Sequence, residues 1–309
     1  MAGGHAHRHH HRDGVPGEGA LLAATVVNAL LTVVQITAGV LAGSLALVAD
    51  AVHNLSDALA LAVAFAARRI ARWPAHGGMT FGYARAELVA ALVNLTTLVA
   101  IGSYLVWEAL VRFFVPEPIA GGVVVLVAGV ALVVDLATAL LTARLARRSV
   151  NVRAAFLHNV ADALGSVAVM VAGAAVWTLG WLWVDPSVTL LIAAYILVHG
   201  GREMVPVVRM LMGATPAGLD AAAVAEAIRR VPGVRDVHHL HIWSLAEHEP
   251  SLEAHVVVPD TTSAVELETV KHRVKAVLAE RFAIRHTTLE MELEGEASAC
   301  PDRDLVVPH

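Results

Sequence analysis

The chain has 309 residues, of which 57% are hydrophobic and only 16% are charged, and its formal net charge is −5. A soluble globular protein rarely has this composition, and the modest negative charge argues against a nucleic-acid partner. The single cysteine, Cys300, excludes an internal disulfide framework and a Cys-x-x-Cys site. Because the apolar residues concentrate in roughly the first two thirds of the chain, we expect a multi-span membrane domain followed by a soluble domain.

The N-terminal stretch is rich in histidine and lacks the apolar core of a cleaved signal peptide. We expect residues 1–18 to form a cytoplasmic tail. The histidines suit weak binding of a soft or borderline cation, and they suit equally a solvated tail or the remnant of a purification tag.

Six stretches follow that are each long and apolar enough to cross the hydrocarbon core of a bilayer, which takes about 20 residues. Only Gly43 and Ser44 separate the first two stretches, which predicts a tight hairpin. We expect the six to form an all-α membrane domain over residues 19–210. The predicted spans are 19–42, 45–68, 84–114, 119–144, 152–180 and 186–209.

The basic residues between the spans indicate the orientation. Arginines flank the connection between the second and third spans and the one between the fourth and fifth, whereas the other three connections contain no lysine or arginine. Because cytoplasmic loops carry the excess of basic residues, we expect both termini in the cytoplasm and a multi-pass protein of the cell (inner) membrane. The flanking residues are Arg68, Arg69, Arg72, Arg85, Arg144, Arg147, Arg148 and Arg153.

The last third of the chain has the patterns of a small soluble domain. An amphipathic helix is followed by two strands, a second helix and a third strand, with Ser263 as the N-cap of the second helix. The order α-β-β-α-β predicts a small α+β sandwich on the cytoplasmic side. We expect this domain over residues 213–294, followed by a C-terminal tail over residues 295–309.

The motif His-x-x-x-Asp occurs twice inside predicted spans, at His53 and Asp57 and again at His158 and Asp162. Residues four apart lie on one face of a helix, so each pair projects together. The second span runs inward and the fifth runs outward, and both pairs lie near the middle of the membrane. We therefore predict that two antiparallel helices bring the four side chains to one point.

Two imidazoles and two carboxylates form a closed tetrahedral ligand set suited to Zn²⁺. A charged carboxylate in the middle of a bilayer costs about 2.5–3.5 kcal/mol on insertion scales, and a shared divalent cation offsets that cost. Since metal binding requires deprotonated ligands, zinc and protons compete for these four groups, which predicts exchange of Zn²⁺ against H⁺.

Two further acids lie in the spans. Asp50, one turn before His53, either orients a ligand or hydrogen-bonds a neighbouring helix. Asp135 is the polar residue of the spans that we single out as an additional proton acceptor. Neither assignment follows from spacing alone.

Four segments resemble the cation diffusion facilitator family of metal/proton antiporters, in the order and at the positions that the family has. They are "SLALVADAVHNLSDALAL", "FGYARAELVAALVN", "NVRAAFLHNVADALGSVAVM" and "VHHLHIWSL". The resemblance implies a homodimer with six spans per protomer and a cytoplasmic domain of ferredoxin-like fold. It further implies export of cytoplasmic metal against protons by alternating access. It also implies that the transport site is His53, Asp57, His158 and Asp162, the ligand set of the zinc-preferring branch.

The same resemblance implies metal binding in the cytoplasmic domain, with His238, His255, Glu290 and Glu292 as ligands. His241 is a further candidate, although strand alternation predicts that it faces away from His238. The family commonly has an aspartate where this chain has His239. The alternative is a group of solvent-facing strand histidines that bind no metal.

Other functions remain to be weighed against an antiporter. An intramembrane metallohydrolase is disfavoured, because the chain has no His-Glu-x-x-His motif and a four-ligand set leaves no position for an activated water. A passive zinc channel and a membrane metal sensor stay open as alternatives. The expected partners are divalent metal ions, protons, the lipid bilayer and a second copy of the chain.

Overall fold

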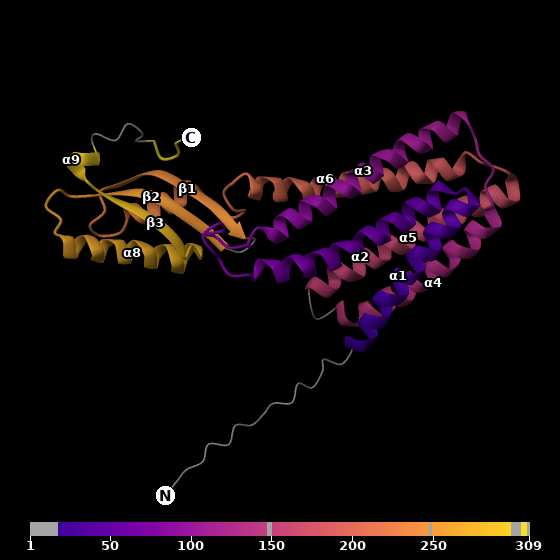
Figure 1. Cartoon of the computed structure of the whole chain (residues 1–309), viewed down its shortest axis with the longest axis horizontal. Coiled ribbons are helices and arrows are strands. Elements are labelled where there is room, and N and C mark those ends of the chain that lie inside the picture. Colours follow the sequence, from indigo (N-terminus) through magenta and orange to yellow (C-terminus); the bar gives the residue numbers. More distant parts are fainter. Residues whose placement is uncertain (1–17, 147–149, 247–248, 298–303, 308–309) are drawn as a thin grey trace, which may run out of the picture. The chain divides into compact units, whose positions relative to one another are not determined.

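The computed structural model describes residues 18–146, 150–246, 249–297 and 304–307. The expectations for the histidine-rich tail, for Cys300 and for the side chains of Arg144, Arg147, Arg148 and Arg153 lie outside what it describes. The six predicted spans correspond to six long helices (Figure 1). These are α1 (Glu18–Ala42), α2 (Leu45–Ala71), α3 (Ala86–Phe114), α4 (Gly121–Ala146), α5 (Val150–Leu179) and α6 (Val184–Leu211).

In the described part of the chain, five helices, α2 to α6, contain segments long and apolar enough to cross a membrane. Within α1, the segment Val27–Ala42 is apolar but shorter. The chain divides into two compact units, one formed by Met1–Leu59 with Leu98–Leu197 and the other by Ala60–Thr97 with Val198–His309. The first unit holds most of the apolar helices, and the second holds the whole sheet.

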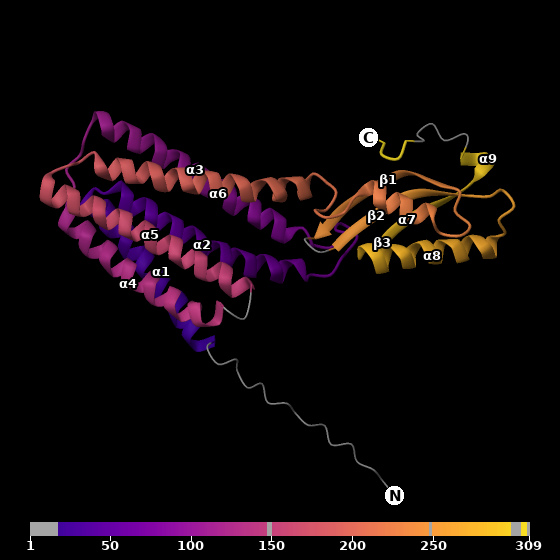
Figure 2. The ribbon, with the colours of Figure 1, turned by 180° about the vertical axis from the view of Figure 1, so that it is seen from behind.

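In the first unit, α4 and α5 run side by side (Figure 2). Small residues allow this close approach. A Cβ atom on Gly121 would lie 2.6 Å from the carbonyl oxygen of Gly173, and one on Gly173 would lie 2.8 Å from Val124. Helix packing at small residues is common in membranes, where van der Waals contact replaces the hydrophobic effect as the driving force.

The tight hairpin between α1 and α2 is present. Gly43 has a φ of 72°, in the left-handed region that glycine adopts without strain. The next helix, α2, begins against the carboxylate of Asp185, which accepts hydrogen bonds from the Ser44 hydroxyl at 2.5 Å and from the backbone N–H of Leu45 at 2.9 Å. A residue at the start of α6 thus caps the helix that carries His53 and Asp57.

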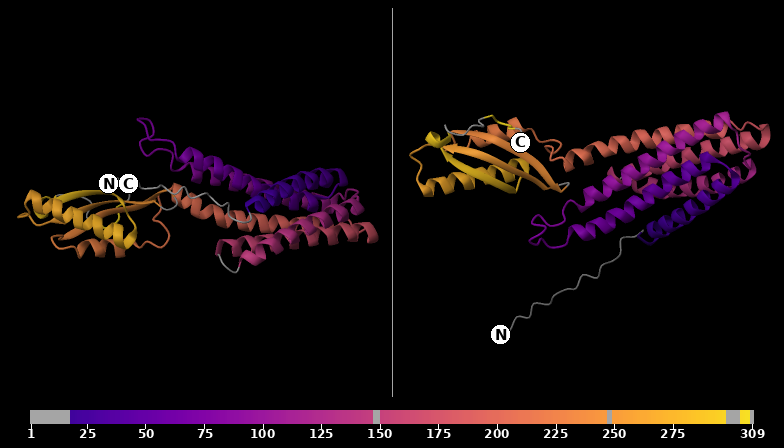
Figure 3. Two further views of the ribbon diagram at one scale, coloured as in Figure 1. Left: turned by 90° about the horizontal axis from the view of Figure 1, so that it is seen from below. Right: turned by 45° about the horizontal axis from the view of Figure 1, so that its top comes forward.

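The second unit contains a three-stranded sheet with the order β1-β2-β3, in which β1 and β2 are antiparallel and β2 and β3 are parallel (Figure 3). Its helices pack on one face, where Ile228, Leu252 and Leu278 are fully buried. The predicted order α-β-β-α-β is confirmed. The elements are α7 (Ala221–Arg229), β1 (Asp236–Ala246), β2 (Glu249–Val258), α8 (Ala264–Phe282), β3 (His286–Leu293) and the short α9 (Glu294–Ala297).

A β-bulge interrupts β1. His238 pairs with His255 and His241 pairs with Glu253, so two residues of β1 lie opposite the single residue Ala254. The extra residue shifts the alternation by one, and both Val237 and Leu240 point into the core. The prediction that His238 and His241 face opposite sides of the sheet was therefore wrong. Both lie on the face that the helices leave open.

The N-cap predicted at Ser263 is confirmed as a capping box. The Ser263 hydroxyl accepts a hydrogen bond from the backbone N–H of Glu266 at 3.4 Å, and the backbone N–H of Ser263 donates to the Glu266 carboxylate at 2.9 Å.

Ser263→Ala is expected to lower the free energy of unfolding of the cytoplasmic domain by about 1 kcal/mol, because α8 loses its side-chain cap. Chemical denaturation of the purified protein, followed by circular dichroism, measures this change. Ser263→Thr keeps a hydroxyl and should retain most of the stability. Equal stability of the alanine variant and the wild type would contradict the assignment of the cap.

Candidate metal centre

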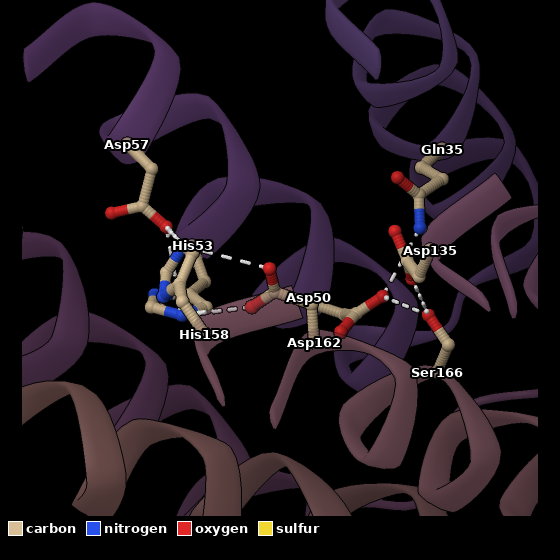
Figure 4. A network of polar contacts seen from close by, with 8 residues as sticks. All are labelled: Gln35, Asp50, His53, Asp57, Asp135, His158, Asp162 and Ser166. Carbon is tan, nitrogen blue, oxygen red and sulfur yellow. Dashed lines mark hydrogen bonds and ion pairs between the residues drawn. The ribbon is translucent and has the colours of Figure 1, made fainter. Parts of the chain in front are cut away.

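The helices α2 and α5 bring the two His-x-x-x-Asp pairs to one point (Figure 4). His53 Nε2 lies 3.7 Å from Asp57 Oδ2 and 3.6 Å from Asp162 Oδ1. His158 Nε2 lies 3.1 Å from Asp57 Oδ2 and 3.5 Å from Asp162 Oδ2. A tetrahedral zinc site with bonds of about 2.0–2.1 Å has ligand atoms about 3.3 Å apart. These four His–Asp separations are close to the spacing that one Zn²⁺ ion requires, and one ligand atom from each of the four side chains lies within 4.8 Å of the others.

Several polar atoms of this cluster are buried without a hydrogen bond. Both ring nitrogens of His53, Oδ2 of Asp57 and Oδ1 of Asp162 find no hydrogen-bond partner among the residues that the structure describes. An unsatisfied buried polar group costs about 1–3 kcal/mol. A cation bound at this point would satisfy three of these atoms at once, Nε2 of His53 and the two carboxylate oxygens, so the cluster fits a metal ion.

The cluster is buried on one side and accessible on the other. The side chains of His53 and Asp162 are 10% and 8% exposed, whereas those of Asp57 and His158 are 39% and 40% exposed. Asp57 follows His53 in α2, and His158 precedes Asp162 in the antiparallel α5. The two accessible ligands therefore lie toward the end of the helices where α2 ends and α5 begins.

An aromatic residue that no sequence pattern indicated packs against the cluster. The ring of Tyr195, in α6, meets the ring of His53 edge-on, with centroids 5.5 Å apart and an interplanar angle of 86°. Tyr195 lies in an apolar span without a polar motif around it. No pattern in the sequence marks it as part of the site.

Beside the cluster lies a second group of buried polar side chains (Figure 4). Asp50 accepts hydrogen bonds from the Gln35 amide at 3.1 Å and from the Ser166 hydroxyl at 3.4 Å. The same hydroxyl lies 2.9 Å from Asp135 Oδ2, and it can donate to only one carboxylate at a time. Of the two roles considered for Asp50, these contacts match bonding to neighbouring helices. The role of Asp135 as a proton acceptor remains a prediction.

The open face of the sheet holds the ligands expected in the cytoplasmic domain. Glu292 lies 3.4 Å from His238 Nε2 and 2.5 Å from His255 Nδ1, and the exposed Glu290 lies 3.4 Å from His255 Nε2. His238 Nε2 and Glu292 Oε2 are buried and lack a hydrogen-bond partner in the described part of the chain, so the cluster fits a metal ion. Burial lowers the pKa of His238, although Glu292 opposes this effect, and the neutral imidazole is the form that binds metal.

His241 does not join this group. Its ligand atoms cluster instead with those of His239 and Glu253, within 4.8 Å of one another. Neither His239 nor Glu253 was predicted as a ligand. The reason is the bulge, which the alternation of residues along the strand does not reveal.

Comparisons with known proteins agree with this architecture. The family model of the cation efflux transmembrane domain matches residues 21–212, and that of the cytoplasmic domain of cation efflux proteins matches residues 216–294. The zinc transporter ZitB of Pectobacterium atrosepticum is 35% identical over 292 residues, which is 94% of this chain and 89% of that protein.

Two other relatives are similar along nearly their whole length. The metal cation efflux system protein CzcD of Cupriavidus metallidurans is 35% identical over 295 residues, 95% of this chain and 91% of the relative. The cadmium, cobalt and zinc/H(+)-K(+) antiporter of Bacillus subtilis is 32% identical over 289 residues, 93% and 92% of the two chains. With both of its parts matched in this way, the chain belongs to the cation efflux family, the cation diffusion facilitators, and is a multi-pass membrane transporter rather than an enzyme.

Proposed function

We propose that this chain exports zinc from the cytoplasm in exchange for protons, and that His53, Asp57, His158 and Asp162 bind the zinc ion during transport. The observation that carries the proposal is the convergence of these four side chains, at contact distances of 3.1 to 3.7 Å, from two antiparallel helices. Relatives named as a zinc transporter and as an antiporter of zinc against H⁺ and K⁺ support it.

The ligand chemistry favours zinc over the alkaline-earth ions. Mg²⁺ and Ca²⁺ prefer oxygen ligands and more than four of them, whereas imidazole nitrogen suits Zn²⁺ and its transition-metal neighbours. Exchange against protons follows from the same ligands. When zinc leaves, the carboxylates lose their counter-ion and the imidazoles regain a free nitrogen lone pair. These groups then take up protons, which zinc must displace to bind again.

The accessible side of the cluster supports a direction of loading. Asp57 and His158 face the end of α2 that carries Arg68 and Arg69 in its last turn. Because basic residues concentrate on the cytoplasmic side, we place this end and both termini in the cytoplasm of a cell (inner) membrane protein. Zinc would then reach the site from the cytoplasm, and alternating access would release it on the other side.

For the cytoplasmic domain we propose a zinc ion held by His238, His255 and Glu292. Glu290 lies at the other ring nitrogen of His255, Nε2, and is not part of this cluster. The three ligands come from β1, β2 and β3, so a bound ion would link all three strands and stabilise the sheet. The match to the cytoplasmic domain of cation efflux proteins also supports assembly as a homodimer.

Reconstituted liposomes test the transport proposal. With a pH-sensitive dye and a zinc indicator trapped inside, addition of zinc outside should produce zinc uptake and proton movement in the opposite direction. Zinc uptake without proton movement would favour a passive channel. If the folded protein moves no zinc in either direction, a membrane metal sensor becomes the better explanation.

A further inference from the structure

The open face of the sheet holds more metal-binding chemistry than the first cytoplasmic cluster uses. We propose that His239, His241 and Glu253 form a second site for a divalent cation of the zinc type, beside the cluster of His238, His255 and Glu292. The inference rests on the cytoplasmic domain alone and stands whether or not zinc is the transported ion.

The bulge in β1 creates this site. His239 has a φ of 50°, in the left-handed region that non-glycine residues enter at a cost of about 1–2 kcal/mol. The backbone around it is fixed, because the N–H of His239 and that of Leu240 donate to the carbonyl oxygens of Asp304 and Leu305 at 3.1 and 2.7 Å. As a result His239, which an unbroken strand would turn toward the core, lies near His241 on the open face.

The three side chains are positioned to share one ion. One ligand atom from each lies within 4.8 Å of the other two. The ring centroids of His239 and His241 are 5.1 Å apart and the ring planes make an angle of 75°, so the rings meet edge to face and are not stacked. Glu253, on β2, lies directly opposite His241 in the register of the sheet. Small side-chain rotations bring such atoms to the spacing of about 3.3 Å that zinc bonds of 2.0–2.1 Å require.

The chemistry of the group is that of an open zinc site. Two imidazoles and one carboxylate leave the fourth tetrahedral position for water or an external ligand. All three side chains are only partly buried, so an ion has access and its ligands lose little hydration. Such a site exchanges its ion more readily than a closed four-ligand site does.

The second site is in contact with the first. The ring of His239 stacks on that of His255, with centroids 4.7 Å apart and an interplanar angle of 8°. His255 is the residue of the first cluster that contacts both Glu290 and Glu292. An ion at either site orients one of the two stacked rings and so favours the orientation of the other.

The test counts zinc in the full-length protein. Purified protein in detergent is stripped with a chelator and dialysed against buffered free zinc, and bound zinc per protomer is measured by elemental analysis. His239→Asn and Glu253→Gln should each bind one zinc ion fewer than the wild type. Asparagine tolerates the left-handed backbone at this position, and glutamine keeps the shape of Glu253 without its charge. His272→Gln, a matched control at an exposed histidine of α8, should bind as much as the wild type.

Two further variants separate this site from the others. His238→Asn should remove the zinc ion of the first cytoplasmic cluster, and Asp57→Ala should remove that of the membrane site. Combined with Glu253→Gln, either substitution should lower the zinc content by one further ion. At saturating free zinc, where the contact between the two cytoplasmic sites no longer affects occupancy, these losses report separately on the first cytoplasmic cluster and on the membrane site. The second site is refuted if both His239→Asn and Glu253→Gln, folded and eluting as the wild type does, keep the wild-type zinc content.

Discussion

Asp57→Ala and Asp162→Ala are each expected to abolish zinc transport while the protein still folds. Each variant removes one of the four zinc ligands. Loss of a residue that only supports a ligand lowers metal affinity by about 10–100-fold, and loss of a ligand itself should lower the affinity of the site far more. Folding should survive, because each substitution removes a carboxylate that is costly at this depth in the membrane. The expected result is no zinc uptake and no zinc-driven proton movement in reconstituted liposomes.

Matched variants make this result specific. Asp162→Asn keeps the volume of the side chain and loses its charge, and we expect it to be as inactive as Asp162→Ala. Glu203→Gln removes an exposed carboxylate from α6, away from the cluster, and should transport as the wild type does. Transport at the wild-type rate by Asp162→Ala would remove these four residues from the proposed function.

Much of the architecture could be predicted because it depends on local patterns. The length of the apolar runs sets the helices α2 to α6, and the i, i+4 spacing puts His53 with Asp57 and His158 with Asp162 on single helix faces. That the two pairs meet followed from their equal depth in antiparallel spans. In the soluble domain the order of helices and strands could likewise be predicted, from the periodicity of apolar residues and from the turn residues.

The features that could not be predicted depend on contacts between distant parts of the chain. The bulge that turns His241 to the open face forms where β1 bonds to Asp304 and Leu305, more than sixty positions away in the printed sequence. Strand alternation carries no sign of it. Tyr195 meets His53 only because α6 packs beside α2, and one tyrosine in an apolar span gives no signal of its own. For such residues the tertiary structure decides the role.

Asp185 is a third residue whose role depends on contacts between distant parts of the chain. Its replacement should have the largest effect on the stability of the protein. In the wild type its carboxylate, fully buried at the start of α6, accepts from the Ser44 hydroxyl and from the backbone N–H groups of Leu45 and Ala46. The first turn of a helix leaves its N–H groups without partners inside the helix, and the positive end of the helix dipole favours an acid there. One carboxylate therefore satisfies the start of α2 and ties it to α6.

Asp185→Ala should lower the free energy of unfolding by about 2–6 kcal/mol, because at least two buried donors then lack an acceptor, at about 1–3 kcal/mol each. Thermal unfolding in detergent measures the loss. Asp185→Asn keeps one acceptor oxygen and should lose about half as much stability. Ser187→Ala, at a half-buried site in the same turn of α6 whose hydroxyl donates to the Trp183 carbonyl oxygen, should lose little. If Asp185→Ala is as stable as Ser187→Ala, the cap does not hold α2. If Asp185→Ala is destabilised as expected, this variant should also transport less zinc, because α2 carries His53 and Asp57 on the turns that follow the cap.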